Sequence, residues 1–84
     1  ASDVYKRQAH NFLMLDYNIS RENLESAVAI TPGLTGPTVS PLQRENWVAV
    51  RAMVPRKEAN LLMDRLAATG AEAILASELR IARI

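Results

Sequence analysis

The sequence predicts one α+β domain, in which two helices cover one face of an antiparallel sheet. Three observations support this class. The chain has only 84 residues, apolar residues repeat with a strand period in some segments and a helix period in others, and proline or glycine separates the segments. Hydrophobic residues make up 49% of the chain and charged residues 23%, which is typical of a packed globular domain.

The first strand is expected from His10 to Ile19, a short run that is dense in apolar and aromatic residues. A helix of about ten residues should follow it. Ser20 is placed to cap this helix, because its hydroxyl can accept a hydrogen bond from an unpaired N–H of the first turn. Pro32 ends the helix, since proline lacks an N–H and disfavours helix in the residue before it. The inward face is expected to consist of Leu24, Ala27 and Val28.

The segment from Thr31 to Pro41 predicts a loop, because it holds three of the four prolines and two of the three glycines. Within it, residues 38–40 are expected to form a short strand at a sheet edge, since prolines flank them. A turn at residues 43–46 then leads into a strand from Trp47 to Val54. Valines alternate along this strand, so Val48, Val50 and Val54 should share one face and Trp47, Arg51 and Met53 the other.

Pro55 ends that strand and precedes a second helix, expected from Arg56 to Thr69. Gly70 should stop the helix, because glycine adopts the left-handed backbone at least cost. The last element is expected to be a buried strand at residues 73–76, which residues 77–84 can prolong. The inward face of the second helix is expected to consist of Ala59, Leu62, Met63, Leu66 and Ala67.

This order, β-α-β-β-α-β, is that of the ferredoxin-like two-layer sandwich, a four-stranded antiparallel sheet with both helices on one face. The other face is left open, and Met14, Trp47 and Met53 are expected to point to it. Because exposed apolar patches mark contact surfaces, the open face predicts oligomerisation. Asp16 and Arg51 are charged positions within strands, and an ion pair between them is favoured over a direct functional role for either.

Charge and composition exclude several classes of function. Ten Lys and Arg residues against nine Asp and Glu leave a net charge of +1, so neither nucleic acid nor an anionic membrane is expected as a partner. The chain has no cysteine, no apolar run long enough to span a membrane and no signal peptide pattern. A soluble, cytoplasmic protein is expected.

Candidate catalytic and metal-binding groups are nearly lacking in the sequence. His10 is the only histidine and there is no cysteine, so no His or Cys set for a metal is expected. Gly33 and Gly36 follow a helix and lack the downstream lysine of a phosphate-binding loop. The carboxylates are spread among basic residues as on a solvated surface. The chain is therefore expected to have no catalytic residue, metal site or cofactor of its own.

The N-terminal residues stand apart from this pattern. Residues 1–9 show no apolar period and no turn chemistry, and a non-native or disordered segment is expected there. The alternative is a frayed native terminus. Residues 10–84 are expected to form the domain.

Four motifs together resemble the C-terminal regulatory domain of long-form ATP phosphoribosyltransferases. The resemblance runs from about Phe12 to Ile84, and its strength lies in the order and separation of the motifs. They are Ile30–Leu34, Pro37–Leu42, Trp47–Arg56 and Gly70–Ser77.

The resemblance implies that the chain is a fragment of a longer enzyme. That enzyme joins ATP to phosphoribosyl pyrophosphate in the first step of histidine biosynthesis, with Mg²⁺, and L-histidine inhibits it through this domain. The catalytic domains would be missing here, so the fragment alone should be inactive. Histidine would sit between domains of neighbouring subunits and shift a homo-oligomer from dimers to a hexamer.

The resemblance also implies an effector site made of Asn18, Leu34, Thr38 and Ala73. Close relatives carry aspartate at position 18, and an amide there loses the charge-assisted attraction to a cationic group of histidine. Each residue also has a structural interpretation: Leu34 as loop packing, Thr38 as a strand residue and Ala73 as core. The alternative function is an oligomerisation or small-ligand-binding module that does not respond to histidine.

Overall fold

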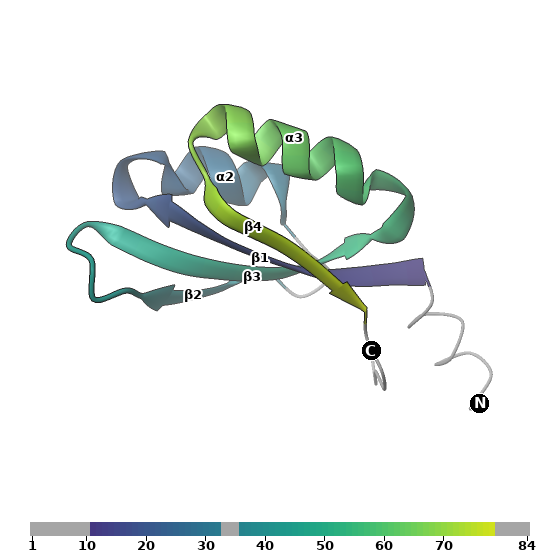
Figure 1. The fold of residues 1–84 in the computed structure, drawn as a ribbon, viewed down its shortest axis with the longest axis horizontal. Coiled ribbons are helices and arrows are strands. Elements are labelled where there is room, and N and C mark those ends of the chain that lie inside the picture. Colours follow the sequence, from purple (N-terminus) through teal and green to yellow (C-terminus); the bar gives the residue numbers. More distant parts are fainter. Residues whose placement is uncertain (1–10, 33–35, 79–84) are drawn as a thin grey trace.

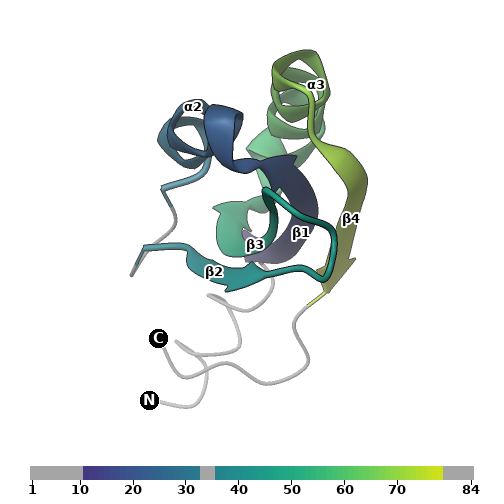
Figure 2. The same cartoon turned by 90° about the vertical axis from the view of Figure 1, so that its left-hand side faces the viewer.

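The computed structural model describes residues 11–32 and 36–78, which form a two-layer sandwich (Figure 1). Four antiparallel strands make one sheet in the order β2-β3-β1-β4, and both helices lie on the same side of it (Figure 2). This confirms the ferredoxin-like fold. The elements are β1 (Phe12–Ser20), η1 (Arg21–Asn23), α2 (Leu24–Ile30), β2 (Thr38–Pro41), β3 (Trp47–Pro55), η2 (Arg56–Glu58), α3 (Ala59–Thr69) and β4 (Glu72–Glu78).

Two further predictions concern a membrane-spanning segment and the N-terminal residues. None of the helices in residues 11–32 and 36–78 is long and apolar enough to cross a membrane. Residues 1–9, for which a non-native or disordered segment is predicted, lie outside the described part, as does His10.

The core lies between the helices and the covered face of the sheet. Alternate residues of β1 and β3 fill it, and none of them is more than 3% exposed. The period of two in the sequence therefore places its apolar side chains as predicted. These strand residues are Leu15, Tyr17 and Ile19 from β1 and Val48, Val50, Ala52 and Val54 from β3. The helices add Ala27, Ala59, Leu62 and Leu66.

A pair of hydroxyl groups is buried in this core. The Tyr17 and Thr31 hydroxyl oxygens are 2.8 Å apart, and the Thr31 hydroxyl donates to the carbonyl oxygen of Ala27 at 3.3 Å. Because the single proton of Thr31 is used there, Tyr17 is the donor between the two hydroxyls. Burial raises the pKa of Tyr17, because it disfavours the charged phenolate.

Both helices begin with a 3₁₀ turn, and the predicted cap of the first one is wrong in its chemistry. Ser20 occupies the N-cap position, but its side chain makes no capping hydrogen bond. Instead, the Arg21 N–H donates to the carbonyl oxygen of Asn46 at 2.8 Å. A backbone group of the turn before β3 thus satisfies one of the unpaired donors of the first turn.

The predicted helix faces are correct except at their margins. Val28 is only half-buried and Ala67 is exposed, while Ile30 packs against the core.

The predicted end of α3 at Gly70 is confirmed, since its φ is 102°. There the N–H of Gly70 bonds to the Ala67 carbonyl and the N–H of Ala71 bonds to the Leu66 carbonyl, as in a Schellman motif.

β4 is an exposed edge strand, so the prediction of a buried strand at residues 73–76 is wrong. Only Ile74 is half-buried, and Leu75 is 65% exposed. The strand hydrogen-bonds to β1 alone, so its other side has no neighbour within the described residues. An apolar run of this length has the same appearance in a central strand and at an edge. The extension over residues 79–84 lies outside the described part.

Candidate functional site

The uncovered face of the sheet carries two adjacent rows of side chains. Residues that pair directly across antiparallel strands point to the same face, so the register defines each row from β2 to β4. The first row consists of Thr38, Arg51, Asp16 and Leu75. The second row consists of Ser40, Ala49, Asn18 and Glu72.

The predicted ion pair between Asp16 and Arg51 is confirmed in the first row. The Arg51 Nε donates to the Asp16 Oδ1 at 2.7 Å. The hydrogen bond with Asp16, helped by its negative charge, raises the pKa of Arg51. The pair therefore holds a cation and an anion side by side at the centre of the open face.

The apolar residues predicted for this face are there, but they are half-buried. Met14, Trp47 and Met53 all have intermediate exposure. The Arg44 guanidinium lies 3.8 Å from the centre of the Trp47 ring and covers part of it. The open face is therefore a mixture of apolar, amide and charged groups.

Two of the predicted effector residues lie beside each other. Asn18 lies near the C-terminal end of β1, and Ala73 is on the neighbouring strand β4, next to Glu72, the register partner of Asn18. The pairing of β1 with β4 shifts between Asp16 and Asn18, which is the mark of a β-bulge. Ala73 has a φ of 53°, so its backbone departs from the regular strand.

Of the other two predicted residues, Thr38 is not brought to this place within one copy of the chain. Thr38 lies on β2, the opposite edge of the sheet, where it pairs with Arg51. Three strand spacings of about 4.8 Å separate β2 from β4. Leu34 lies outside the described residues.

Two charged residues near Asn18 were missed as site candidates. The Arg44 Nη1 lies 3.1 Å from the Glu72 Oε1, and Glu72 is the register partner of Asn18. In the sequence, Arg44 belongs to a turn and Glu72 follows a helix stop, so both looked like ordinary solvated charges. Only the strand order, which places the turn before β3 near the start of β4, could have indicated the pair.

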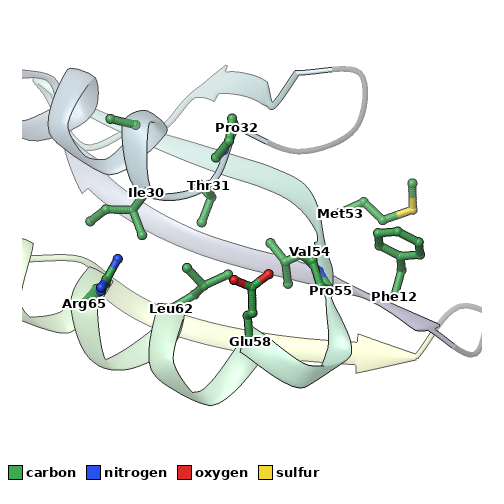
Figure 3. A pocket seen from close by; sticks show the side chains of 11 residues that line it. Phe12, Ile30, Thr31, Pro32, Met53, Val54, Pro55, Glu58, Leu62 and Arg65 are labelled. Atoms are coloured by element: carbon green, nitrogen blue, oxygen red, sulfur yellow. The ribbon is translucent and has the colours of Figure 1, made fainter.

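A separate cavity of about 400 Å³ lies between the end of α2, the start of α3 and the end of β3. Most of its wall is apolar, and Figure 3 shows Glu58 from η2 and Arg65 from α3 on either side of Leu62. Of the predicted effector residues that the structure describes, Asn18, Thr38 and Ala73, none lines it. The lining residues are Phe12, Ala29, Ile30, Thr31, Pro32, Met53, Val54, Pro55, Glu58, Leu62 and Arg65.

Metal coordination finds no support in the described residues. Across residues 11–32 and 36–78, no three His, Cys, Asp or Glu side chains gather where they could hold a metal ion. The acidic groups of the open face, Asp16 and Glu72, are each paired with an arginine. The polar groups of this face therefore include two arginine–carboxylate pairs and the Asn18 amide.

Comparison with known proteins assigns the family. Residues 9–81 match the family model described as HisG, C-terminal domain. An ATP phosphoribosyltransferase of Corynebacterium glutamicum is 75% identical over 76 residues, which are 90% of this chain and 27% of that protein. Proteins of the same name from Corynebacterium efficiens and Nocardia farcinica are 72% and 60% identical over 76 and 75 residues, 90% and 89% of this chain.

The matched region covers 27% of the C. efficiens protein and 26% of the N. farcinica protein. The chain thus spans about a quarter of the length of the curated relatives it matches. Because the family model covers residues 9–81 of 84, the chain belongs to the family of HisG C-terminal domains.

Proposed function

We propose that this chain is the histidine-sensing regulatory domain of a longer ATP phosphoribosyltransferase. The observation that carries the proposal is the 75% identity over 90% of the chain to a protein of that name. The parent would join ATP to phosphoribosyl pyrophosphate in histidine biosynthesis. A cytoplasmic location stays a prediction.

Catalysis and magnesium belong, in this proposal, to the other domains of the parent. The described residues offer no carboxylate cluster that fits Mg²⁺. The carboxylates of the open face are engaged with Arg44 and Arg51. In this proposal, the domain binds an effector and transmits that binding through its contacts.

Polar groups suited to a free amino acid are present at the proposed site. The Asn18 amide is half-buried and makes no side-chain hydrogen bond in the described part of the chain. The Thr38 hydroxyl is exposed, and the backbone of Ala73 departs from the regular strand. An ammonium, a carboxylate and an imidazole each need such a partner when they leave water.

The positions of these residues favour a site between two copies. Asn18 and Ala73 lie near the β4 edge, whereas Thr38 is on the β2 edge. A histidine that contacts all three would join the β4 edge of one copy to the β2 edge of the next. Such a head-to-tail contact is heterologous and closes into a ring when the rotation permits. Histidine would then favour the assembled state, because only that state holds the complete site.

The proposal is tested by titrating the chain with L-histidine in a calorimeter and following its assembly by sedimentation velocity. We expect saturable heat and a shift to larger species. Asn18→Leu and Thr38→Val, which keep side-chain size but remove hydrogen-bonding groups, should each weaken binding. Asn60→Leu, on the exposed side of α3, is the matched control and should bind as the original chain does.

Two results would count against histidine sensing. The absence of heat at millimolar histidine, together with unchanged assembly, would overturn the proposal. If the chain assembled through its open face regardless of histidine, the alternative of an oligomerisation module would be favoured.

A further inference from the structure

We propose that Arg44 and Glu72 act together as a clamp for the α-ammonium and α-carboxylate of the effector, beside Asn18. This inference rests on the proposed function and names the groups that would select an α-amino acid. It concerns two residues of this chain that the sequence alone did not single out, Arg44 in a predicted turn and Glu72 among the solvated carboxylates.

The clamp is located by the strand register. Glu72 is the direct partner of Asn18 across β1 and β4, so both side chains point to the open face. The Arg44 Nη1 approaches the Glu72 Oε1 to 3.1 Å. One positive charge, one negative charge and an amide without a side-chain partner in the described residues thus lie in one place.

An ion pair at a surface is complementary to a zwitterion. The ammonium and the carboxylate of an α-amino acid are bonded to the same carbon atom, so they lie about as close together as the paired groups of Arg44 and Glu72. A ligand that lies antiparallel to this ion pair would place its carboxylate against the Arg44 guanidinium and its ammonium against the Glu72 carboxylate. The four charges would then alternate, and no charge would lose an opposite neighbour.

Opening this pair to admit a ligand costs little. The side chains of Arg44 and Glu72 are 58% and 57% exposed, and exposed ion pairs contribute little to stability. The guanidinium has five N–H donors, so it can bind a ligand carboxylate while it keeps a bond to Glu72.

Arg44 is held in position before a ligand arrives, and the backbone of Glu72 is held in the sheet. The Arg44 guanidinium is stacked over Trp47 at 3.8 Å from the ring centre, an attraction between a cation and an aromatic face. Glu72 is the first residue of β4 and precedes the bulge residue Ala73. Such pre-organisation lowers the ordering cost of binding.

A second ion pair on the same strand provides the control. The Arg56 Nη1 lies 3.1 Å from the Glu78 Oε1, the same distance as in the proposed clamp. Glu78 is at the other end of β4 from Glu72. A general effect of removing a carboxylate from this strand would appear at both positions, whereas ligand recognition would appear at Glu72 alone.

The experiment combines changes in the protein with changes in the ligand. Three ligands are titrated into the original chain and into the variants Arg44→Gln, Glu72→Gln and Glu78→Gln. They are histidine, histidinol, which lacks the carboxylate, and imidazolepropionate, which lacks the ammonium. Arg44→Gln should weaken histidine binding roughly tenfold and histidinol binding hardly at all. Glu72→Gln should weaken histidine binding by a similar factor and leave imidazolepropionate binding unchanged. Glu78→Gln should change none of the three.

The outcomes separate the clamp from the proposed function. The clamp is overturned and histidine sensing stands if the original chain binds histidine but two results follow in the variants. These are that Arg44→Gln weakens the binding of histidine and histidinol equally, and that Glu72→Gln weakens the binding of histidine and imidazolepropionate equally. If the original chain binds none of the three ligands, both proposals are overturned. A thermal unfolding midpoint equal to that of the original chain shows that a variant is folded and excludes loss of folding as the cause.

Discussion

The two faces of the sheet are built from the same strands but have opposite chemistry. On the covered face, β1 and β3 present only apolar side chains and the Tyr17 hydroxyl, which donates to Thr31. On the open face, the alternate residues of the same strands include Asp16, Arg51 and Asn18. Because successive strand residues point to opposite faces, one segment supplies apolar packing on one side and polar groups on the other. Substitutions on the two faces should therefore have separable effects.

The largest effect is expected in the core. Leu66→Ala should lower the free energy of unfolding by about 2 to 5 kcal/mol, because Leu66 is fully buried in α3 and its loss leaves a cavity. Leu61→Ala, on the same helix but 53% exposed, should change it by less than about 0.5 kcal/mol. Urea denaturation of both variants checks this, and equal losses would show that α3 does not cover the sheet as described.

The next effect concerns the buried hydroxyl pair. Thr31→Val should cost about 1 to 3 kcal/mol of unfolding free energy, since it leaves the Tyr17 hydroxyl buried without its acceptor. Adding Tyr17→Phe to this variant should recover part of the loss, because the unpaired group is then removed. A double-mutant cycle measured by chemical denaturation tests the coupling, and strictly additive losses would contradict it.

The same hydroxyl predicts a dependence of stability on high pH. Burial raises the pKa of Tyr17 in the folded state above its ordinary value of 10.0, so folding favours the protonated form. The stabilisation is present below pH 10.0 and is lost as the pH rises through the higher folded-state pKa. The unfolding free energy, measured between about pH 9 and about pH 11, should fall more steeply in the original chain than in Tyr17→Phe. Parallel curves would contradict the burial of this group.

The smallest effect is expected for the ion pair of the open face. Arg51→Gln should leave the thermal unfolding midpoint unchanged within error, in spite of the 2.7 Å contact with Asp16. The guanidinium is solvated, and exposed pairs contribute little to stability. Differential scanning calorimetry at low and high salt measures this, and a large loss of stability would indicate that the open face is part of the folding core.

The fold was predictable where one physical rule decides the outcome. Alternation in β3 places Val48, Val50 and Val54 in the core, and Gly70 ends α3 through its left-handed backbone. The burial of β4 was not predictable, because an apolar run does not reveal whether a strand is central or at an edge. The cap at Ser20 failed since a distant backbone group, the carbonyl of Asn46, satisfies a donor of the first turn.

The candidate site was predictable only in part. The pairing of Asp16 with Arg51 could be foreseen from two charges within strands. The proximity of Asn18 to Ala73 depends on the register between β1 and β4 and on the bulge there. These features follow from tertiary packing, which local propensity and periodicity do not specify.

The two edges of the sheet also limit how the chain can aggregate. An open sheet with regular edges can add strands from other copies without end, and fibres grow in this way. The bulge at Ala73 interrupts the outer row of backbone groups on β4, and Pro41 removes a donor from β2. Within residues 36–78, each edge therefore offers only a short hydrogen-bonding ladder, which disfavours indefinite growth and favours side-chain docking as the route to finite assemblies.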